Sequence, residues 1–157
     1  MAQFGAANRL KEVKPSGIRR ISLQAEKVRN AIDLGMGEPD FSPPTHVLEA
    51  AKRALDEGKT RYTSTAGIPE LLGALAEKAK KDYGLSYDPN TEILVTVGAT
   101  QAVFLAMQAL INPGDEVIIP DPCFVCYEPD IRIAGGTPIS TPMLVKDKFA
   151  LDEDAIA

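Results

Sequence analysis

The chain lacks several features that define whole classes of protein. Its two cysteines are too few for a disulfide framework, and its single histidine, His46, has no acid or thiol placed to complete a metal site. No apolar run approaches the roughly 20 residues of a membrane-spanning helix. The first residues, MAQFGAANRLKEVK, contain no apolar segment of a secretory signal. These absences predict a cytoplasmic protein without a membrane span or a metal.

Positive charge is also scarce. The 157 residues include 17 Lys and Arg against 22 Asp and Glu, so the net charge is -5. Binding to nucleic acid by charge alone needs a basic surface, and we therefore expect no nucleic-acid partner. The 45% of hydrophobic residues are enough for the core of one ordinary domain.

Residues 92–119, EILVTVGATQAVFLAMQALINPGDEVII, organise the rest of the sequence. The apolar run 93–97 is typical of a parallel strand covered on both faces, and Gly98 ends it. Residues 99–111 predict a helix that is apolar nearly all round and therefore buried. A turn then leads to a second strand that begins at Glu116. This pattern predicts a βαβ unit and an α/β fold.

The turn Gly98-Ala99-Thr100 is a candidate anion site. It is neither a P-loop nor a Rossmann fingerprint, because GxxxxGK[ST] and GxGxxG are both absent. A strand that turns directly into a helix nevertheless presents the free N–H groups of the first helical turn, which favour phosphate. Many α/β proteins have such a turn without a ligand, so the motif alone is weak.

Other elements are expected on both sides of this stretch. Helices are predicted over 18–31, from Pro43-Pro44 to Gly58, from Gly67 to Gly84 and over about 123–134, with a parallel strand over 137–141 and a helix start at 151–157. A domain seldom ends one turn into a helix, so we expect an amino-terminal piece of a longer protein. The loop 32–41 contains Gly37, whose backbone either makes a plain connection or approaches a ligand closely.

Cys123 and Cys126 form a CxxC motif where a strand leads into a helix. This arrangement is found in thiol-disulfide proteins, in which the helix start lowers the pKa of a thiol. The spacing favours the interpretation as two small apolar residues at i and i+3 in a core. A small redox or binding protein stays as an alternative.

Taken together, the motifs resemble the amino-terminal part of class I/II aminotransferases, the aspartate aminotransferase-like enzymes of pyridoxal-phosphate fold type I. GEPDF followed by Y…AGIPEL, in that order and spacing, is specific. The residues that carry the resemblance are Pro15–Ile18, Leu34–Phe41, Arg61-Tyr62, Ala66–Leu71, Val97–Ala102 and Asn112–Val117.

The resemblance implies a pyridoxal 5'-phosphate (PLP) site. It implies that Gly98, Ala99 and Thr100 hold the cofactor phosphate, that Phe124 stacks on the pyridine ring, and that Tyr62 reaches the cofactor of a neighbouring subunit in a homodimer. It also implies that the backbone of Gly37 meets the substrate carboxylate and that Ile18 lies near the substrate side chain. The implied substrates are an amino acid and a 2-oxo acid.

The resemblance further implies a fold and its division. Residues 1–43 match the N-terminal arm and small-domain segment, and residues 44–157 match the first part of the large PLP-binding domain, a mainly parallel sheet with helices on both faces. Thr100 stands where some members that use acidic substrates carry lysine, so a neutral or aromatic substrate is equally compatible.

The family's Schiff-base lysine lies further along a full chain than residue 157. We therefore expect no catalytic residue within this sequence and no activity from it alone. A PLP-dependent lyase or synthase of the same fold is a further alternative, because it shares these motifs.

Overall fold

The computed structural model describes residues 5–11, 13, 17–32, 34–35 and 37–156. The chain divides into two compact units, each described by itself below. Unit 1 comprises residues 1–36 and 97–157, and unit 2 comprises residues 37–96. Among the described residues, no helix combines the length and the apolar character needed to cross a membrane.

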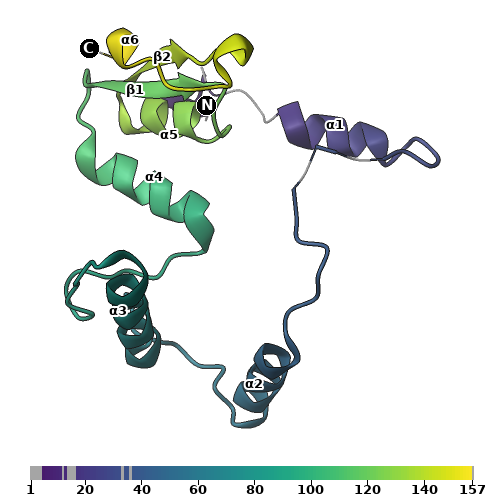
Figure 1. The fold of residues 1–157 in the computed structure, drawn as a ribbon, viewed down its shortest axis with the longest axis vertical. Coiled ribbons are helices and arrows are strands. Elements are labelled where there is room, and N and C mark those ends of the chain that lie inside the picture. The colour runs from purple at the N-terminus through teal and green to yellow at the C-terminus, as the bar shows by residue number, and fades with distance from the viewer. Residues whose placement is uncertain (1–4, 12, 14–16, 33, 36, 157) are drawn as a thin grey trace, which may run out of the picture. The chain divides into compact units, whose positions relative to one another are not determined.

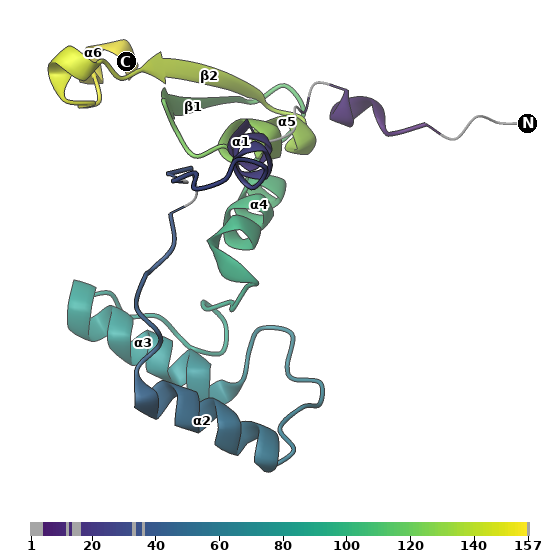
Figure 2. The ribbon, with the colours of Figure 1, turned by 90° about the vertical axis from the view of Figure 1, so that its right-hand side faces the viewer.

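Unit 1 contains the sheet. Strands β1 (Glu116–Asp121) and β2 (Thr137–Pro142) pair in parallel, with Glu116 opposite Thr137 and Asp121 opposite Pro142. Helix α5 (Tyr127–Ala134) connects them in a βαβ crossover, which consists of the strand expected from Glu116, the helix expected over about 123–134 and the parallel strand expected over 137–141. The βαβ unit predicted for residues 92–119 is not observed, because the described structure assigns no strand over 93–97. Helix α5 lies between the sheet and helix α4 (Gly98–Leu110), and it packs against both (Figures 1 and 2).

The remaining elements of unit 1 are short. They are the 3-10 turns η1 (Asn8–Leu10) and η2 (Val145–Asp147) and the helices α1 (Gly17–Ala25) and α6 (Glu153–Ile156). Of these, η1 contacts α5.

The core of unit 1 gathers where α5 meets the sheet. Ile131 of α5 is fully buried, and Ile119 of β1 is 8% exposed. Gly136 lets the chain pass closely here, since a Cβ at this position would lie 2.7 Å from Ile111 Cγ2 and 3.2 Å from the carbonyl oxygen of Asp115. The preceding Gly135 ends α5 with a left-handed φ of 97°.

Unit 2 consists of two helices and the segments that join them. Helix α2 (Thr45–Asp56) ends in a Schellman motif, in which Lys59 N–H donates to the Ala54 carbonyl and Gly58 N–H to the Leu55 carbonyl, both at 2.9 Å. Helix α3 (Pro69–Tyr83) starts at a proline and is followed by Gly84 in a left-handed conformation. Both ends agree with the glycine and proline signals in the sequence.

The predicted strand over 93–97 is wrong for the described structure, which assigns no strand there. The segment is held instead against the turn that precedes α3, because Val95 N–H donates to the Ala66 carbonyl at 2.8 Å. A parallel strand forms only beside a hydrogen-bonded neighbour, and β1 takes β2 as its partner. The apolar composition of residues 93–97 therefore predicted a strand, but it could not show whether a neighbouring strand pairs with this segment.

Two predicted helices are shorter than expected. Helix α1 ends at Ala25 rather than at residue 31, and Asn30 takes a left-handed φ of 62°. Helix α5 begins at Tyr127 rather than near residue 123. Pro129 explains the second difference, because proline has no N–H to donate and is tolerated only in the first turn of a helix.

The expected burial of the apolar helix α4 is also wrong, since none of its residues is buried. Val103, Phe104 and Met107 are half-buried and share one face. Helix α5 covers one side of α4, and the other side is exposed in the part of the chain that the structure describes.

Candidate functional site

The predicted anion turn, Gly98 to Thr100, forms the first turn of α4, a helix of 13 residues. The residue before it, Val97, has no side chain that could cap the helix, and the first turn contains no acid. The first N–H groups of an α-helix have no acceptor within the helix. This helix start therefore has the partial positive charge of a helix N-terminus, and its first turn contains no acidic residue.

The backbone of the anion turn is open. Gly98 has a left-handed φ of 75°, and a Cβ built on it would meet nothing within 4 Å. Ala99 and Thr100 are exposed, and Thr100 adds a hydroxyl donor. Just beyond, the Gln101 side-chain oxygen accepts a hydrogen bond from Val97 N–H at 2.5 Å, which holds the chain at the helix entry. Backbone donors, a hydroxyl and no competing acid fit a phosphate group.

Phe124 lies in the turn between β1 and α5, in the same unit as the anion turn. Its ring packs edge-on against Tyr127, with 5.8 Å between the ring centres and 72° between the planes. Tyr127 N–H also donates to the Phe124 carbonyl at 3.1 Å. The Phe124 side of this pair stays half exposed, so the ring is fixed by a neighbour and still has a free surface for a flat ligand.

The other three predicted residues are distributed over both units. Ile18 lies in the first turn of α1 in unit 1 and is 40% exposed. Tyr62 lies in the connection between α2 and α3 in unit 2 and is fully exposed. Gly37 begins unit 2, and a Cβ on it would meet nothing within 4 Å. Unit 1 thus holds the anion turn, Phe124 and Ile18, whereas Tyr62 and Gly37 belong to unit 2.

The two thiols are free and half-buried. Burial raises the pKa of Cys123, and the nearby carboxylates of Asp121 and Glu128 raise it further. Burial and then the carboxylate of Asp130 raise the pKa of Cys126. A redox thiol needs a lowered pKa, so this environment disfavours the CxxC redox alternative and agrees with the interpretation as small apolar residues.

Sequence reasoning missed Asp130. It is an acid on α5, yet it is only 8% exposed, and burial raises the pKa of its carboxyl group. The signal in the sequence is its position, one residue before the core residue Ile131 and one helical turn after Cys126.

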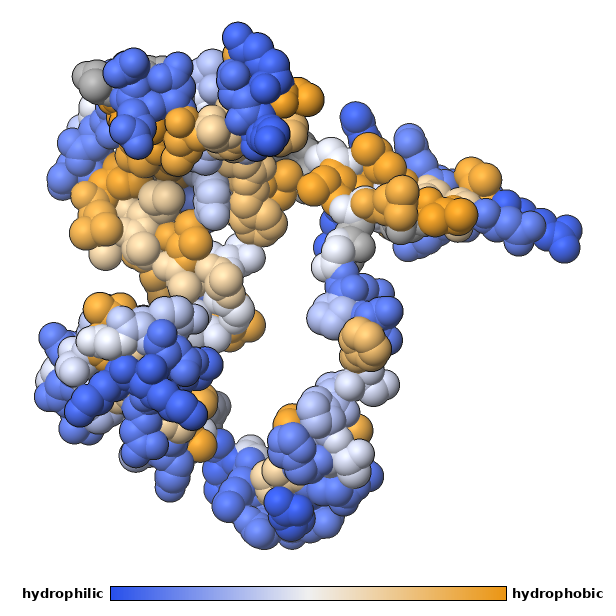
Figure 3. All heavy atoms as spheres, in the orientation of Figure 1, coloured by the Kyte–Doolittle hydropathy of each residue, from blue (hydrophilic) through white to orange (hydrophobic). Residues whose placement is uncertain are grey.

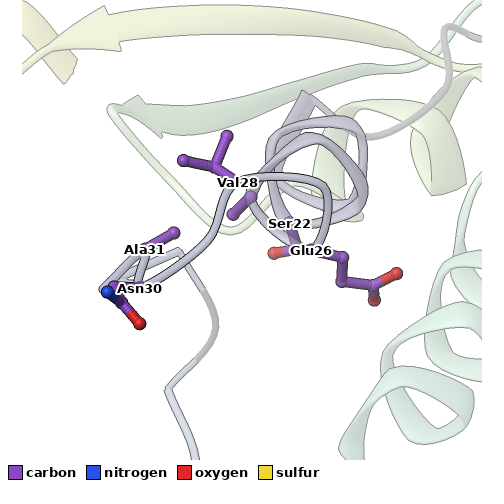
Figure 4. Close-up of a pocket in the computed structure, with 6 residues that line it drawn as sticks. Ser22, Glu26, Val28, Asn30 and Ala31 are labelled. Atoms are coloured by element: carbon purple, nitrogen blue, oxygen red, sulfur yellow. The ribbon is translucent and has the colours of Figure 1, made fainter.

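A surface pocket of about 250 Å³ lies at the end of α1 and in the turn that follows it. Figure 4 shows that the Glu26 carboxylate points away from Asn30 and Ala31, and Ser22 Oγ is itself buried. The polar groups of this pocket do not converge on one point, and Ile18 does not line it. The lining residues are Ser22, Ala25, Glu26, Val28, Asn30 and Ala31.

Comparison with known proteins shows the family to which the chain is similar. Residues 29–157 match the family "Aminotransferase class I and II". The chain is 45% identical over 150 residues to the aspartate aminotransferase of Pyrococcus abyssi, covering 96% of this chain and 39% of that protein. It is 42% identical over 150 residues to aromatic-amino-acid aminotransferase 2 of Thermococcus litoralis, with the same two coverages.

Solved structures give the same result. The chain superposes on the aspartate aminotransferase of Thermus thermophilus with maleate with a TM-score of 0.89 and 43% identity, covering 98% of this chain and 41% of that one. The aromatic aminotransferase of Pyrococcus horikoshii gives a TM-score of 0.78 and 46% identity, covering 87% of this chain and 36% of that one.

A parallel βαβ unit with helices packed against it defines an α/β protein. The chain belongs to the class I and II aminotransferase family. It spans about two-fifths of the length of the curated relatives it matches, which is 39% for the first two.

Proposed function

We propose that this chain is the amino-terminal, cofactor-binding part of an aminotransferase that moves an amino group between an amino acid and a 2-oxo acid. The observation that carries the proposal is the start of α4, where an apolar residue precedes the helix, the first turn contains no acidic residue, and a Cβ on Gly98 would meet nothing within 4 Å. The family membership supplies the reaction class.

The cofactor of the proposal is pyridoxal 5'-phosphate, which when bound takes up the amino group and withdraws electrons from the reacting carbon. In this chain, the N–H groups of Ala99 and Thr100 and the Thr100 hydroxyl bind the phosphate. The ring of Phe124 would pack against the pyridine ring. These contacts fix the cofactor by its phosphate and by one face.

The remaining site residues are proposed from the family resemblance. The backbone N–H of Gly37 binds the substrate carboxylate, and Ile18 borders the substrate side chain. Tyr62 donates to the phosphate of the partner's cofactor, so the whole protein works as a homodimer. Its full exposure in this chain is compatible with a role in a neighbouring subunit.

The domain division and the location complete the proposal. Residues 1–43 form the arm and small-domain segment, and residues 44–157 form the first part of the large domain. The proposal includes substrates with acidic side chains and substrates with neutral or aromatic side chains, since the relatives include an aspartate and an aromatic-amino-acid aminotransferase. A cytoplasmic location stays a prediction.

Binding of pyridoxine 5'-phosphate tests the cofactor site. This compound has no aldehyde, so it cannot link to surface lysines. We expect calorimetry to detect binding of pyridoxine 5'-phosphate and no binding of pyridoxine. The reason is that the helix start contributes to the binding free energy only when the ligand carries a phosphate. Equal affinity for the two compounds would contradict the phosphate role of the anion turn.

Two activity measurements separate the alternatives. The 157-residue chain with added PLP is expected to show no transaminase turnover, and turnover would refute that part of the proposal. For the full-length protein, formation of a 2-oxo acid with the amine conserved in the acceptor supports an aminotransferase. Elimination products would instead support a lyase or synthase of the same family.

A further inference from the structure

Asp130 is a buried carboxyl group in the interior helix of unit 1. Helix α5 lies between the sheet and α4, and its buried residues are Asp130 and Ile131. Asp130 is 8% exposed, and within the described residues its Oδ2 has no hydrogen-bond partner. A buried polar atom without a partner is uncommon in folded proteins and costs free energy, most of all when it is charged.

The elements packed against α5 offer Asp130 little compensation. Helix α4 and strand β2 contain no charged residue. The charged groups of the other two elements are Glu116 and Asp121 on β1 and Arg9 on η1.

Helix α5 itself contributes two further charges, Glu128 and Arg132. They form an ion pair with each other at 3.0 Å. Burial is the one cause that raises the pKa of Asp130, so none of these charges offsets the loss of hydration.

We propose that Asp130 makes the packing of α5 sensitive to pH: its neutral form is accommodated between the sheet and α4, and its ionisation loosens the helix. The inference concerns packing alone and does not depend on the cofactor site.

The direction follows from proton linkage. An aspartate in an unfolded chain titrates near 3.9, and the pKa of Asp130 in the fold lies higher. Between these two values the folded state keeps a proton that the unfolded state has released. Stability is therefore greatest below the unfolded value and is lost as the pH rises through the folded value.

Urea unfolding across the pH range tests this with two variants. Asp130→Asn removes the titration and keeps the shape, and Asp56→Asn removes a carboxylate at an exposed site on α2. We expect the unfolding constant of the wild type, divided by that of Asp130→Asn, to rise with pH by up to about tenfold per unit within the window. The same ratio measured with Asp56→Asn in place of Asp130→Asn should not rise with pH in this way.

Hydrogen exchange tests whether the effect of pH is confined to α5 or extends to the stability of the whole chain. In hydrogen exchange corrected for intrinsic pH dependence, amides of α5 should lose protection as the pH rises, whereas those of α3 should not. The loss should vanish in Asp130→Asn. Parallel pH curves for the wild type and Asp130→Asn would overturn the proposal. Should the variant fail to fold, a ¹³C carboxyl titration of wild-type Asp130 at the ordinary aspartate pKa would overturn it equally.

Discussion

Helices α3 and α4 begin alike but are completed differently. Each follows a β-branched residue that cannot cap it, Ile68 before α3 and Val97 before α4. Helix α3 has Pro69 at its first position and Glu70 in its first turn, whereas α4 starts with a glycine and has no acid there. On the face drawn in Figure 3, side chains over α3 are mainly hydrophilic and those over α4 mainly apolar.

The C-terminal ends of the two helices also differ in whether they carry charged side chains. Helix α3 carries Lys80 and Lys81 in its last turn, where cations offset the negative end of the helix dipole. Helix α4 has no basic residue in its last turn. Helix α3 thus carries charged side chains of the favourable sign in both terminal turns, whereas α4 carries none in either. A first turn without an acidic residue, rather than a glycine alone, therefore distinguishes the proposed anion site.

The largest effect is expected from overpacking unit 1. Gly136→Ala would place a Cβ 2.7 Å from Ile111 Cγ2 and should lower the free energy of unfolding by about 1–3 kcal/mol. Gly73→Ala is the matched change on α3, where nothing lies within 4 Å, and should stabilise by about 0.5–1 kcal/mol. Urea denaturation compares the two, and equal effects would show that the packing at Gly136 is looser than described.

A carboxylate in the first turn of α4 should make this helix resemble α3. Thr100→Glu is expected to weaken the binding of pyridoxine 5'-phosphate about tenfold, because a contribution of about 1–2 kcal/mol from the helix start is replaced by repulsion. Thr100→Gln has a similar size without the charge and serves as the control in calorimetry. Equal affinities of the Glu and Gln variants would mean that the phosphate binds elsewhere.

A side chain at Gly98 tests the backbone of the same turn. Gly98→Ala must hold a left-handed φ of 75°, which should destabilise the turn by about 1–2 kcal/mol and weaken phosphate binding up to about tenfold. Gly98→Asn should be milder, because asparagine tolerates this conformation. An alanine variant with wild-type affinity and stability would contradict the strained entry to α4.

The smallest effect is expected at α3. Glu70→Gln removes the acid from its first turn and should lower the free energy of unfolding by about 0.3–1 kcal/mol, less at high salt. Phosphate binding should not change. A loss of phosphate affinity in Glu70→Gln would remove the distinction between the two helix starts.

Local signals in the sequence predicted much of the fold. Glycines at 58, 84 and 135 end helices as expected, and the strand expected over 137–141 pairs in parallel with the strand that begins at Glu116. The helix start at Gly98 was predicted from the change of an apolar run into a small-residue turn. Each of these features depends on residues close together in the sequence.

Features that depend on distant partners were harder to predict. The run 93–97 has the composition of a strand, but composition does not supply a neighbouring strand. Burial of Asp130 depends on α5 lying between the sheet and α4, which the spacing of an acid beside Ile131 does not specify. Pro129 was a local signal that was overlooked, and it sets the start of α5.

The central claim is that the first turn of α4, and not that of α3, binds a phosphate. Amide chemical shifts recorded by NMR during a titration with pyridoxine 5'-phosphate test it most directly. We expect the largest shifts at Ala99 and Thr100 and none at Glu70 and Leu71. Shifts of equal size at both helix starts, or none at Ala99 and Thr100 under saturating ligand, would contradict it.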